Sequence, residues 1–443
     1  MKKVFLIVML TAFAWCSVAA QEDSKAKKSD GKVKVTPYGF VRNYFVYDSR
    51  RTYTVLDGEY NMQPYDVNWN LFEAQAALEG VERVDLNAVP SASLLALTTR
   101  VGLNLDGPYI WGAKTTGKIE GDFAGFGTNN YVIRLRHAFV QLDWDSCGKL
   151  LVGQYWHPLS GDIMPEVLGM AAGAPFRAHS RTPQISYQVY RGKLGFAASL
   201  LSQLQYVSSG PAGASYSYAY NAIVPEAFVG LNYKSSRVYA QLGADVLTIR
   251  PRVQGSAVTS TNVNYNIPVS DKLTSVTPTF YFQYVEPKFA VKFRTIYAQN
   301  TSHVNQLNGY AVTDVLPDGS WEYQPMRASI SYLNLRYGST YRFNLFLGYM
   351  KNLGIENGEL YNFGTATNHV YHIYTKGNFD NINSVYRVAP SISYNVQAFN
   401  FGVEYELTAA TYGDLATNGS ILDNDNLRQV VNHRVCVLMK YNF

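Results

Sequence analysis

Five histidines lie in or near segments that read as loops, and their side chains could take part in catalysis or bind a metal. They are His157, His179, His303, His369 and His372. His369 and His372 bracket two residues and have no acidic neighbour at metal-ligand spacing, and the nucleophile motif Gly-x-Ser-x-Gly is absent. Because the histidines form no recognisable constellation, we expect no enzyme, no bound metal and no cofactor.

Basic side chains offer a different chemistry, the transient binding of anions. Arg134 and Arg136 stand at alternate positions of an apolar-polar stretch, and Arg177 and Arg181 follow in the segment 158–182. A guanidinium group can hold a carboxylate or a phosphate through two parallel hydrogen bonds. Arginines on the wall of a narrow aqueous pore would therefore favour the passage of anions.

The elements that must position these side chains are strands, and the last one shows the pattern. Between Val431 and Phe443 the apolar residues fall on every second position. They are Val435, Val437, Met439, Tyr441 and Phe443, which alternate with Arg434, Cys436, Leu438, Lys440 and Asn442. Such a two-faced strand is what a membrane-spanning β-barrel needs, although a soluble sandwich can also end on an alternating strand.

The same alternation recurs through the chain and predicts an all-β fold, a transmembrane antiparallel barrel of about sixteen strands. The expected strands are 36–47, 91–104, 112–124, 129–144, 149–157, 183–191, 193–203, 223–234, 237–249, 272–285, 288–299, 325–337, 340–352, 381–396, 398–411 and 428–443.

The connections between these strands alternate in length. Long links are separated by tight ones such as Arg191-Gly192, Ser235-Ser236, Glu286-Pro287 and Gly338-Ser339, and only 125–128 is short where a long loop is expected. Bacterial outer-membrane barrels have short periplasmic turns and long extracellular loops, so we expect both ends of the barrel chain to be periplasmic.

The first residues predict export. Lys2 and Lys3 precede an apolar run that is too short for a membrane-spanning helix, and small residues follow before Gln21. We expect a signal peptide at 1–20, a polar periplasmic lead-in at 21–35 and a single barrel at 36–443. Trp15 before Cys16 argues against a lipoprotein signal.

Composition agrees with an exported barrel. The chain has 35 tyrosines against 22 phenylalanines, and an aromatic ring with a polar tip suits the rims of a barrel, where lipid meets water. The balance of 38 basic to 33 acidic residues is too even to indicate nucleic-acid binding. Of the cysteines beyond the signal, Cys147 and Cys436, we expect free thiols, with a disulfide as the alternative.

The charged residues share the inner face of the strands, which predicts a water-filled interior. The basic residues placed there are Arg42, Arg100, Lys114, Lys118, Arg134, Arg136, Arg237, Lys292, Arg294, Arg336, Arg342, Arg387, Arg434 and Lys440, and the acidic residues are Glu120, Asp122, Glu226, Asp245, Glu404 and Glu406. The excess of bases predicts a wall that favours anions. The alternative is that many of these charges pair across strands.

Two features modify this wall. The strand 129–144 changes phase, and a β-bulge near His137 reconciles its two halves. The long segment 158–182 has an apolar stretch from Val167 to Ala172 that would be poorly placed in open water. We expect it to fold inward as a constriction loop that faces Arg134 and Arg136. The alternative is an external loop packed against a neighbouring subunit.

At these segments the chain resembles a known family, the DcaP-like porins of Gram-negative outer membranes and their Bacteroidetes relatives. The matching stretches are Arg134-Leu135-Arg136-His137-Ala138-Phe139-Val140, Val152-Gly153-Gln154-Tyr155-Trp156, Ala174-Pro175-Phe176, Arg181-Thr182-Pro183-Gln184-Ile185, Asn87-Ala88-Val89-Pro90 and Glu120-Gly121-Asp122-Phe123. The resemblance spans roughly 85–190 and is only architectural beyond. It implies a sixteen-stranded homotrimer with an arginine-lined eyelet that passes small anions such as dicarboxylates. By position, Arg134, Arg136, Arg177 and Arg181 correspond to that eyelet.

Together these observations predict a porin of the Gram-negative outer membrane, in contact with its lipid and with small anionic solutes. The expected pore-lining residues are Arg134, Arg136, Arg177, Arg181, Arg42, Lys114, Lys118 and Arg294. The alternative is a plugged structural or adhesive barrel that presents its extracellular loops. An energy-coupled receptor would need a large plug domain, for which the lead-in is too short.

Overall fold

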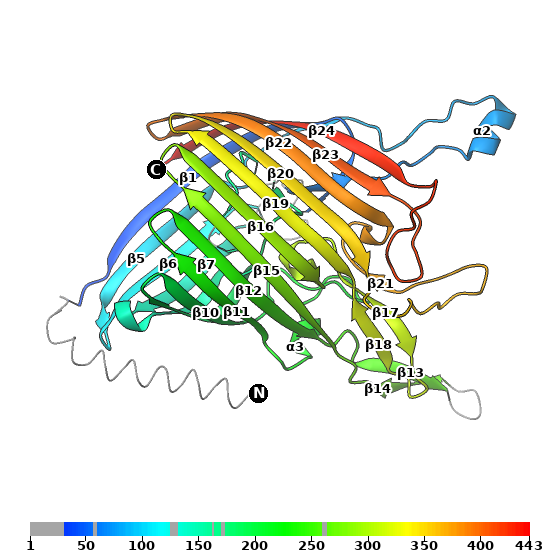
Figure 1. The fold of residues 1–443 in the computed structure, drawn as a ribbon, viewed down its shortest axis with the longest axis horizontal. Coiled ribbons are helices and arrows are strands. Elements are labelled where there is room, and N and C mark those ends of the chain that lie inside the picture. The colour runs from blue at the N-terminus through cyan, green and yellow to red at the C-terminus, as the bar shows by residue number, and fades with distance from the viewer. Residues whose placement is uncertain (1–30, 56–59, 125–131, 162–163, 170–172, 259–263) are drawn as a thin grey trace.

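A closed antiparallel β-barrel dominates the computed structural model, which describes residues 31–55, 60–124, 132–161, 164–169, 173–258 and 264–443. Sixteen long strands form its wall (Figure 1). They are β1 (Lys34–Asp48), β5 (Arg100–Ile110), β6 (Ala113–Asp122), β7 (Arg134–Asp143), β8 (Lys149–Trp156), β9 (Arg181–Arg191), β10 (Leu194–Leu201), β11 (Glu226–Lys234), β12 (Val238–Ile249), β15 (Leu273–Val285), β16 (Phe289–Gln299), β19 (Arg327–Gly338), β20 (Tyr341–Gly354), β22 (Ile382–Val396), β23 (Phe399–Tyr412) and β24 (Arg428–Asn442). The predicted fold class is confirmed.

The first and last strands close the barrel. β1 pairs with β24 from Phe40↔Asn442 to Asp48↔Arg434, and its other edge pairs with β5 and with the short strand β4 (Ser91–Leu95). The prediction of one strand over 91–104 is wrong. A turn at Ala96–Thr99, closed by the bond from the Thr99 amide to the Ala96 carbonyl, separates β4 from β5, and β5 then continues to Ile110.

Smaller elements belong to the long links. They are the hairpins β2 (Thr52–Val55) with β3 (Tyr60–Pro64) and β13 (Gln254–Val258) with β14 (Asn264–Pro268), the three-stranded sheet of β17 (Tyr310–Val315), β18 (Trp321–Pro325) and β21 (Ile373–Tyr374), the helices α2 (Glu73–Glu79) and α3 (Ser217–Tyr220), and the 3-10 turns η2 (Asp145–Cys147), η4 (Ser302–Val304) and η5 (Phe379–Asn381). In Figure 1, α2, β13, β14, β17 and β18 lie at the end of the barrel away from the C-terminus.

No helix in the described part of the chain has the length and apolar character needed to cross a membrane.

The outer wall is apolar, as the alternating pattern predicts. In β24, Val437, Met439 and Tyr441 are exposed whereas Arg434 and Cys436 are buried inside. Other strands expose aliphatic and aromatic side chains in the same way, among them Val101, Leu103, Ile119, Val140, Val152, Ile185, Phe196, Leu231, Leu242, Val276, Phe280, Phe343, Ile392 and Val403. The outer side chains are apolar, and in a closed barrel the backbone groups of every strand are paired with a neighbouring strand. Both properties suit this wall to contact with lipid.

Three segments enter the barrel and fill part of its interior. They are β3, the residues 300–309 around η4, and the link between β8 and β9, whose described residues 157–161, 164–169 and 173–180 we call the inward loop. Buried residues of all three pack in one apolar cluster with side chains of the wall. The cluster includes Tyr60, Met62, Leu159, Phe176, Val304, Leu307, Ile330, Phe346 and Val385.

The termini and the thiols complete the fold. The predicted signal peptide at 1–20, most of the lead-in and the short link 125–128 lie outside the described residues. Cys147 and Cys436 are both thiols, as predicted.

Candidate functional site

The bulge in β7 brings two inward side chains next to each other. Glu120 pairs with His137 and Gly121 pairs with Leu135, so Arg136 is the extra residue of the bulged strand. Arg136 and His137 are both buried inside the barrel, whereas Leu135 is exposed on the outer wall. The predicted β-bulge is thus confirmed. It places Arg134 and Arg136 on the inner face beside the acidic residues of β6.

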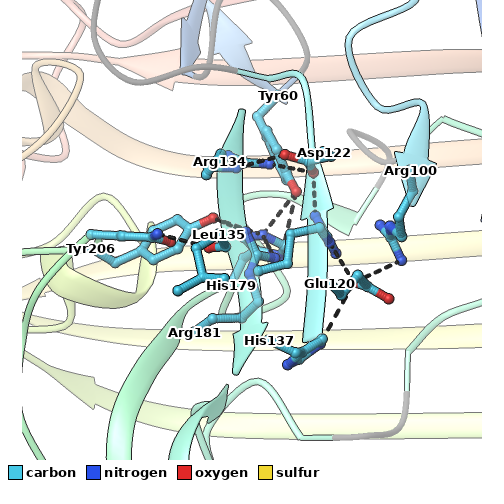
Figure 2. Close-up of polar contacts among 12 residues, drawn as sticks. Tyr60, Arg100, Glu120, Asp122, Arg134, Leu135, His137, His179, Arg181 and Tyr206 are labelled. Carbon is cyan, nitrogen blue, oxygen red and sulfur yellow. Dashed lines mark hydrogen bonds and ion pairs between the residues drawn. The ribbon is translucent and has the colours of Figure 1, made fainter. Parts of the chain in front are cut away.

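Ion pairs hold these two arginines against β6, and Figure 2 shows the pair of Arg134 with Asp122. Arg134 donates from Nε to Oδ1 of Asp122 at 2.9 Å and from Nη2 to Oδ2 at 2.8 Å. Arg136 donates from Nε to Oε1 of Glu120 at 2.7 Å and from Nη1 to Oδ2 of Asp122 at 2.6 Å. Both guanidinium groups are therefore neutralised within the wall, and Arg134 and Arg136 are only 5% and 1% exposed.

His179 of the inward loop and Arg181 at the start of β9 approach this pair (Figure 2), and Arg177 of the inward loop joins them through its contact with His179. Arg177 Nη2 lies 2.8 Å from Nδ1 of His179, and the Tyr60 hydroxyl lies 2.9 Å from its Nε2. Arg181 Nη1 also lies 3.3 Å from Nε2, so both ring nitrogens face guanidinium donors, which favours the neutral imidazole. Neither Arg177 nor Arg181 has an ion-pair partner among the residues the structure places.

His179 belongs to the inward loop and not to a wall strand. Its burial is the main cause that lowers its pKa. The positive charges of Arg177 and Arg181 lower this pKa further, so it lies well below its usual value. His179 is therefore neutral at physiological pH, as its contact with Arg177 requires.

The indole of Trp156 is the common contact of three of these cations. The guanidinium carbons of Arg181, Arg177 and Arg136 lie 4.9, 5.6 and 5.8 Å from the centre of its ring. An aromatic face attracts cations, so Trp156 stabilises a cluster whose like charges repel one another.

A cavity of about 420 Å³ opens beside this cluster. Its wall contains six basic residues and one acidic residue. They are Arg42, Arg100, Lys118, Arg136, Arg177 and Lys440, with Glu120. Arg42, Lys118, Arg177 and Lys440 form no ion pair within the described ranges, so their charges are available to a solute.

A second cavity of about 580 Å³ adjoins the first at Tyr155 and Trp156, which line both. Its wall is mostly uncharged and polar, with Gln141, Gln184, Gln188, Gln241, Gln283 and several tyrosines. It reaches the tight turn at Ser235-Ser236, on the end of the barrel opposite to the long loops. The charged cavity and the polar one are thus neighbouring spaces on two sides of the same aromatic pair.

The structure separates the eight predicted pore-lining residues into groups. Arg134, Arg136, Arg177 and Arg181 come together, but of these four only Arg136 and Arg177 line the charged cavity. Arg42 and Lys118 also line it, whereas Arg294 lines the polar cavity and Lys114 is an exposed residue, 3.8 Å from Asp106. Arg134, Arg181, Arg294 and Lys114 do not line the charged cavity.

Arg100 and Lys440 belong in the set as well. Both were assigned to the inner face from strand parity, but only the packing of β1, β5 and β24 shows that they border one cavity.

The predicted list of inward acids was incomplete. Asp48 pairs with Arg434 at 2.8 Å, and Glu166 of the inward loop pairs with Arg336 at 3.2 Å and with Lys292 at 3.3 Å. The predicted first strand, 36–47, ends before Asp48, and Glu166 lies in a predicted loop, so strand parity assigns neither residue to the interior. Many inner charges are therefore paired between neighbouring strands or with the inward loop, and the free positive charge concentrates at the charged cavity.

The inward loop is attached to the wall by polar contacts along its length. The amides of Leu168 and Gly169 donate to the two carboxylate oxygens of Glu404 at 2.9 and 3.1 Å. Arg42 donates to the Leu168 carbonyl, and Arg294 donates to the Ser160 carbonyl at 3.0 Å. These contacts hold the loop inside the barrel, next to the charged cavity.

Known proteins share this architecture. No protein-family model matches the chain, and no curated protein matches its sequence. The crystal structure of the outer membrane channel DcaP of Acinetobacter baumannii superposes with a TM-score of 0.62 at 18% identity, over 94% of this chain and 99% of that chain. OmpT of Vibrio cholerae, at 11% identity and a TM-score of 0.49, and Salmonella typhi OmpF in complex with daunomycin, at 11% and 0.48, match over 94% of this chain and 99% of theirs.

The match to DcaP confirms the predicted resemblance to the DcaP-like porins at the level of the fold. A closed sixteen-stranded barrel with an apolar outer wall is the architecture of an outer-membrane porin. The chain is therefore a protein of the Gram-negative outer membrane, as its sequence predicts.

Proposed function

We propose that the chain is a passive diffusion channel for small hydrophilic anions, dicarboxylates among them, and that it carries out no catalytic chemistry. The observation that carries this proposal is the charged cavity, with six basic residues and one acidic residue. In a narrow space of low dielectric such an excess raises the local concentration of anions.

Each part of the cavity would have a separate task. Arg42, Lys118, Arg177 and Lys440 would attract the solute, because no carboxylate of the described chain neutralises them. Arg136 is held by Glu120 and Asp122, so it would shape the wall more than it would bind the solute. The inward loop supplies Arg177 and narrows the passage.

The proposal is tested by the reversal potential of single channels in a planar bilayer under a salt gradient. We expect anion preference in the wild type and a shift toward zero in the double variant Arg42→Gln with Lys440→Gln. Lys288→Gln is the matched control, because Lys288 is an exposed residue of a tight turn and its loss removes charge without touching the cavity. A cation-selective wild type, or a double variant that behaves like the control, would contradict anion selection at this cavity.

A second candidate function rests on the filled interior. β3, residues 300–309 and the inward loop bury an apolar cluster inside the barrel, as expected of a plugged structural or adhesive barrel. Conductance separates the two functions, because a plugged barrel inserts into a bilayer without stepwise openings.

The homotrimer implied by the family resemblance belongs to the proposal. Native mass spectrometry in detergent is expected to give three copies of the chain, and a monomer under conditions that preserve other porin trimers would oppose it.

A further inference from the structure

Four metal-ligating side chains from distant parts of the chain meet inside the barrel, away from the charged cavity. They are His157 directly after β8, Glu226 at the start of β11, Asp245 in β12 and His303 in η4. One ligand atom of each residue lies within 4.8 Å of those of the other three. All four side chains are at most 3% exposed.

The two histidines converge on one carboxylate oxygen. Nε2 of His157 lies 2.6 Å from Oε1 of Glu226, and Nε2 of His303 lies 2.9 Å from the same atom. Such convergence is expected when several donor atoms are arranged around one central position.

The second carboxylate makes the cluster electrostatically incomplete. Oε2 of Glu226 and Oδ1 of Asp245 are buried and accept no hydrogen bond from a donor in the described chain. The nearby guanidinium of Arg294 does not compensate them, because it donates to the carbonyls of Ser160 and Pro158 and to the hydroxyl of Thr279. Two buried carboxylates side by side require either a shared proton or a cation.

The donor set selects the cation. Two imidazole nitrogens and two carboxylate oxygens form a tetrahedral ligand set that suits a divalent transition metal, zinc above all, and not calcium or magnesium, which prefer oxygen ligands alone. We propose that His157, Glu226, Asp245 and His303 bind a single divalent transition-metal ion, with zinc as the physiological candidate. The charge of the ion would balance the two carboxylates.

When the metal binds, bonds to the ion replace the hydrogen bonds from the two Nε2 atoms to Glu226, and one further contact must change. The Leu159 amide donates to Nδ1 of His157 at 3.1 Å, which places the ring proton on Nε2. Coordination at Nε2 displaces this proton, and the contact with Leu159 opens as Nδ1 takes it up. His157 is therefore the ligand that adjusts, whereas Nδ1 of His303 is buried without a hydrogen-bond partner among the described residues and is free to carry its proton.

The site would act as a structural clamp on the inward loop. The His179 amide donates to the carbonyl of Val304, the neighbour of His303, at 2.7 Å, and the His157 amide donates to the Ser180 carbonyl at 3.0 Å. The backbone of residues 179–180 is thus bonded to the residues around His157 and His303. An ion that joins these two histidines to the wall strands β11 and β12 would therefore also hold the segment that carries Arg177 and Arg181.

The test uses the folded full-length protein, extracted without metal-affinity chromatography and dialysed. We expect elemental analysis to find about one zinc ion per chain, removable by a strong chelator with a fall in unfolding temperature and restored by added zinc. Cobalt(II) added to the chelated protein should give the visible absorption of a tetrahedral site. Asp245→Asn and His303→Gln should each weaken metal retention by about 10-fold or more.

His369→Gln is the matched control, since His369 is an exposed loop histidine that contacts Tyr371. It should keep the metal. If the folded wild type retains no zinc after reconstitution and gives no cobalt absorption, the two carboxylates share a proton and the proposal is wrong. Should neither cluster variant fold, the zinc content and cobalt spectrum of the wild type decide alone. None of these results depends on conductance, so the metal site and the channel function are tested separately.

Discussion

The ring of Phe176 in the inward loop lies directly over Gly348 of β20. A Cβ atom at Gly348 would be only 2.4 Å from two ring carbons of Phe176, well inside the contact distance. The wall therefore has a gap at this position that the loop fills. A similar gap exists at Gly402, where a Cβ atom would be 2.5 Å from a methyl carbon of Leu168.

Gly348→Ala is expected to displace the inward loop, because the buried ring cannot move away as the end of a flexible side chain would. Overpacking of this kind costs about 1–3 kcal/mol. Single-channel conductance should rise or become noisier, and the unfolding temperature should fall. When Phe176 is already replaced by alanine, adding Gly348→Ala should cause no further fall in unfolding temperature and no further change in conductance. If Gly348→Ala costs as much with the ring removed as with it present, the contact with Phe176 is not the cause.

Asp122→Asn is expected to destabilise the barrel strongly. Asp122 accepts hydrogen bonds from both Arg134 and Arg136, and removing one partner of a buried ion pair costs about 3–5 kcal/mol. Chemical unfolding in detergent measures the change. Asp106→Asn is the control, because its pair with Lys114 is about half exposed and such surface pairs contribute about 1 kcal/mol or less. Equal losses in the two variants would refute the structural role of the buried pair.

Acid is expected to loosen the inward loop through His179. The pKa of His179 is lowered in the folded protein, so below about pH 6.5 the unfolded chain binds a proton that the folded chain does not. Stability should therefore fall as the pH drops from 7.5 to 5. The slope should be smaller in His179→Gln and unchanged in His369→Gln, and unfolding temperatures at the two pH values measure it. An identical slope in all three proteins would assign the acid response to other groups.

Glu404→Ala is expected to release the part of the inward loop around Leu168. Glu404 accepts the amides of Leu168 and Gly169, and it is buried, so its loss leaves two donors unsatisfied. Conductance should become more variable in time. Glu286→Ala is the control, because Glu286 pairs with Arg237 in a largely exposed salt bridge away from the loop. Unchanged channel recordings for Glu404→Ala would show that other contacts suffice to hold the loop.

The alternation of apolar and polar residues along the sequence predicted the barrel wall well. It could not predict contacts between segments that are far apart in the sequence. The alternation in β24 and the phase change at His137 were readable because neighbours two residues apart share a face. The break at Ala96–Thr99 was missed because the residues on both sides of the turn keep a strand-like composition.

The residues around the charged cavity were predictable only in part, because they too depend on contacts between segments far apart in the sequence. Arg134 and Arg136 were assigned to the interior correctly, but their burial depends on Asp122 and on segments that enter the lumen. Tyr60 lies in a hairpin within a long link, and no local pattern predicts that this hairpin enters the barrel. The metal-ligating cluster is harder still, since Glu226 and His303 are separated by 77 positions and no spacing motif joins them.

The pairing of β1 with β24 also has a consequence for assembly. Asp48 and Arg434, which form a buried ion pair across this seam, are 386 positions apart. Almost all of the barrel chain must be synthesised before the seam can form, and until then both edges of the sheet expose unpaired backbone groups that can bind other chains. The incomplete barrel is thus the state at risk of aggregation, and the seam is where a chaperone or an insertion machinery would have to protect it.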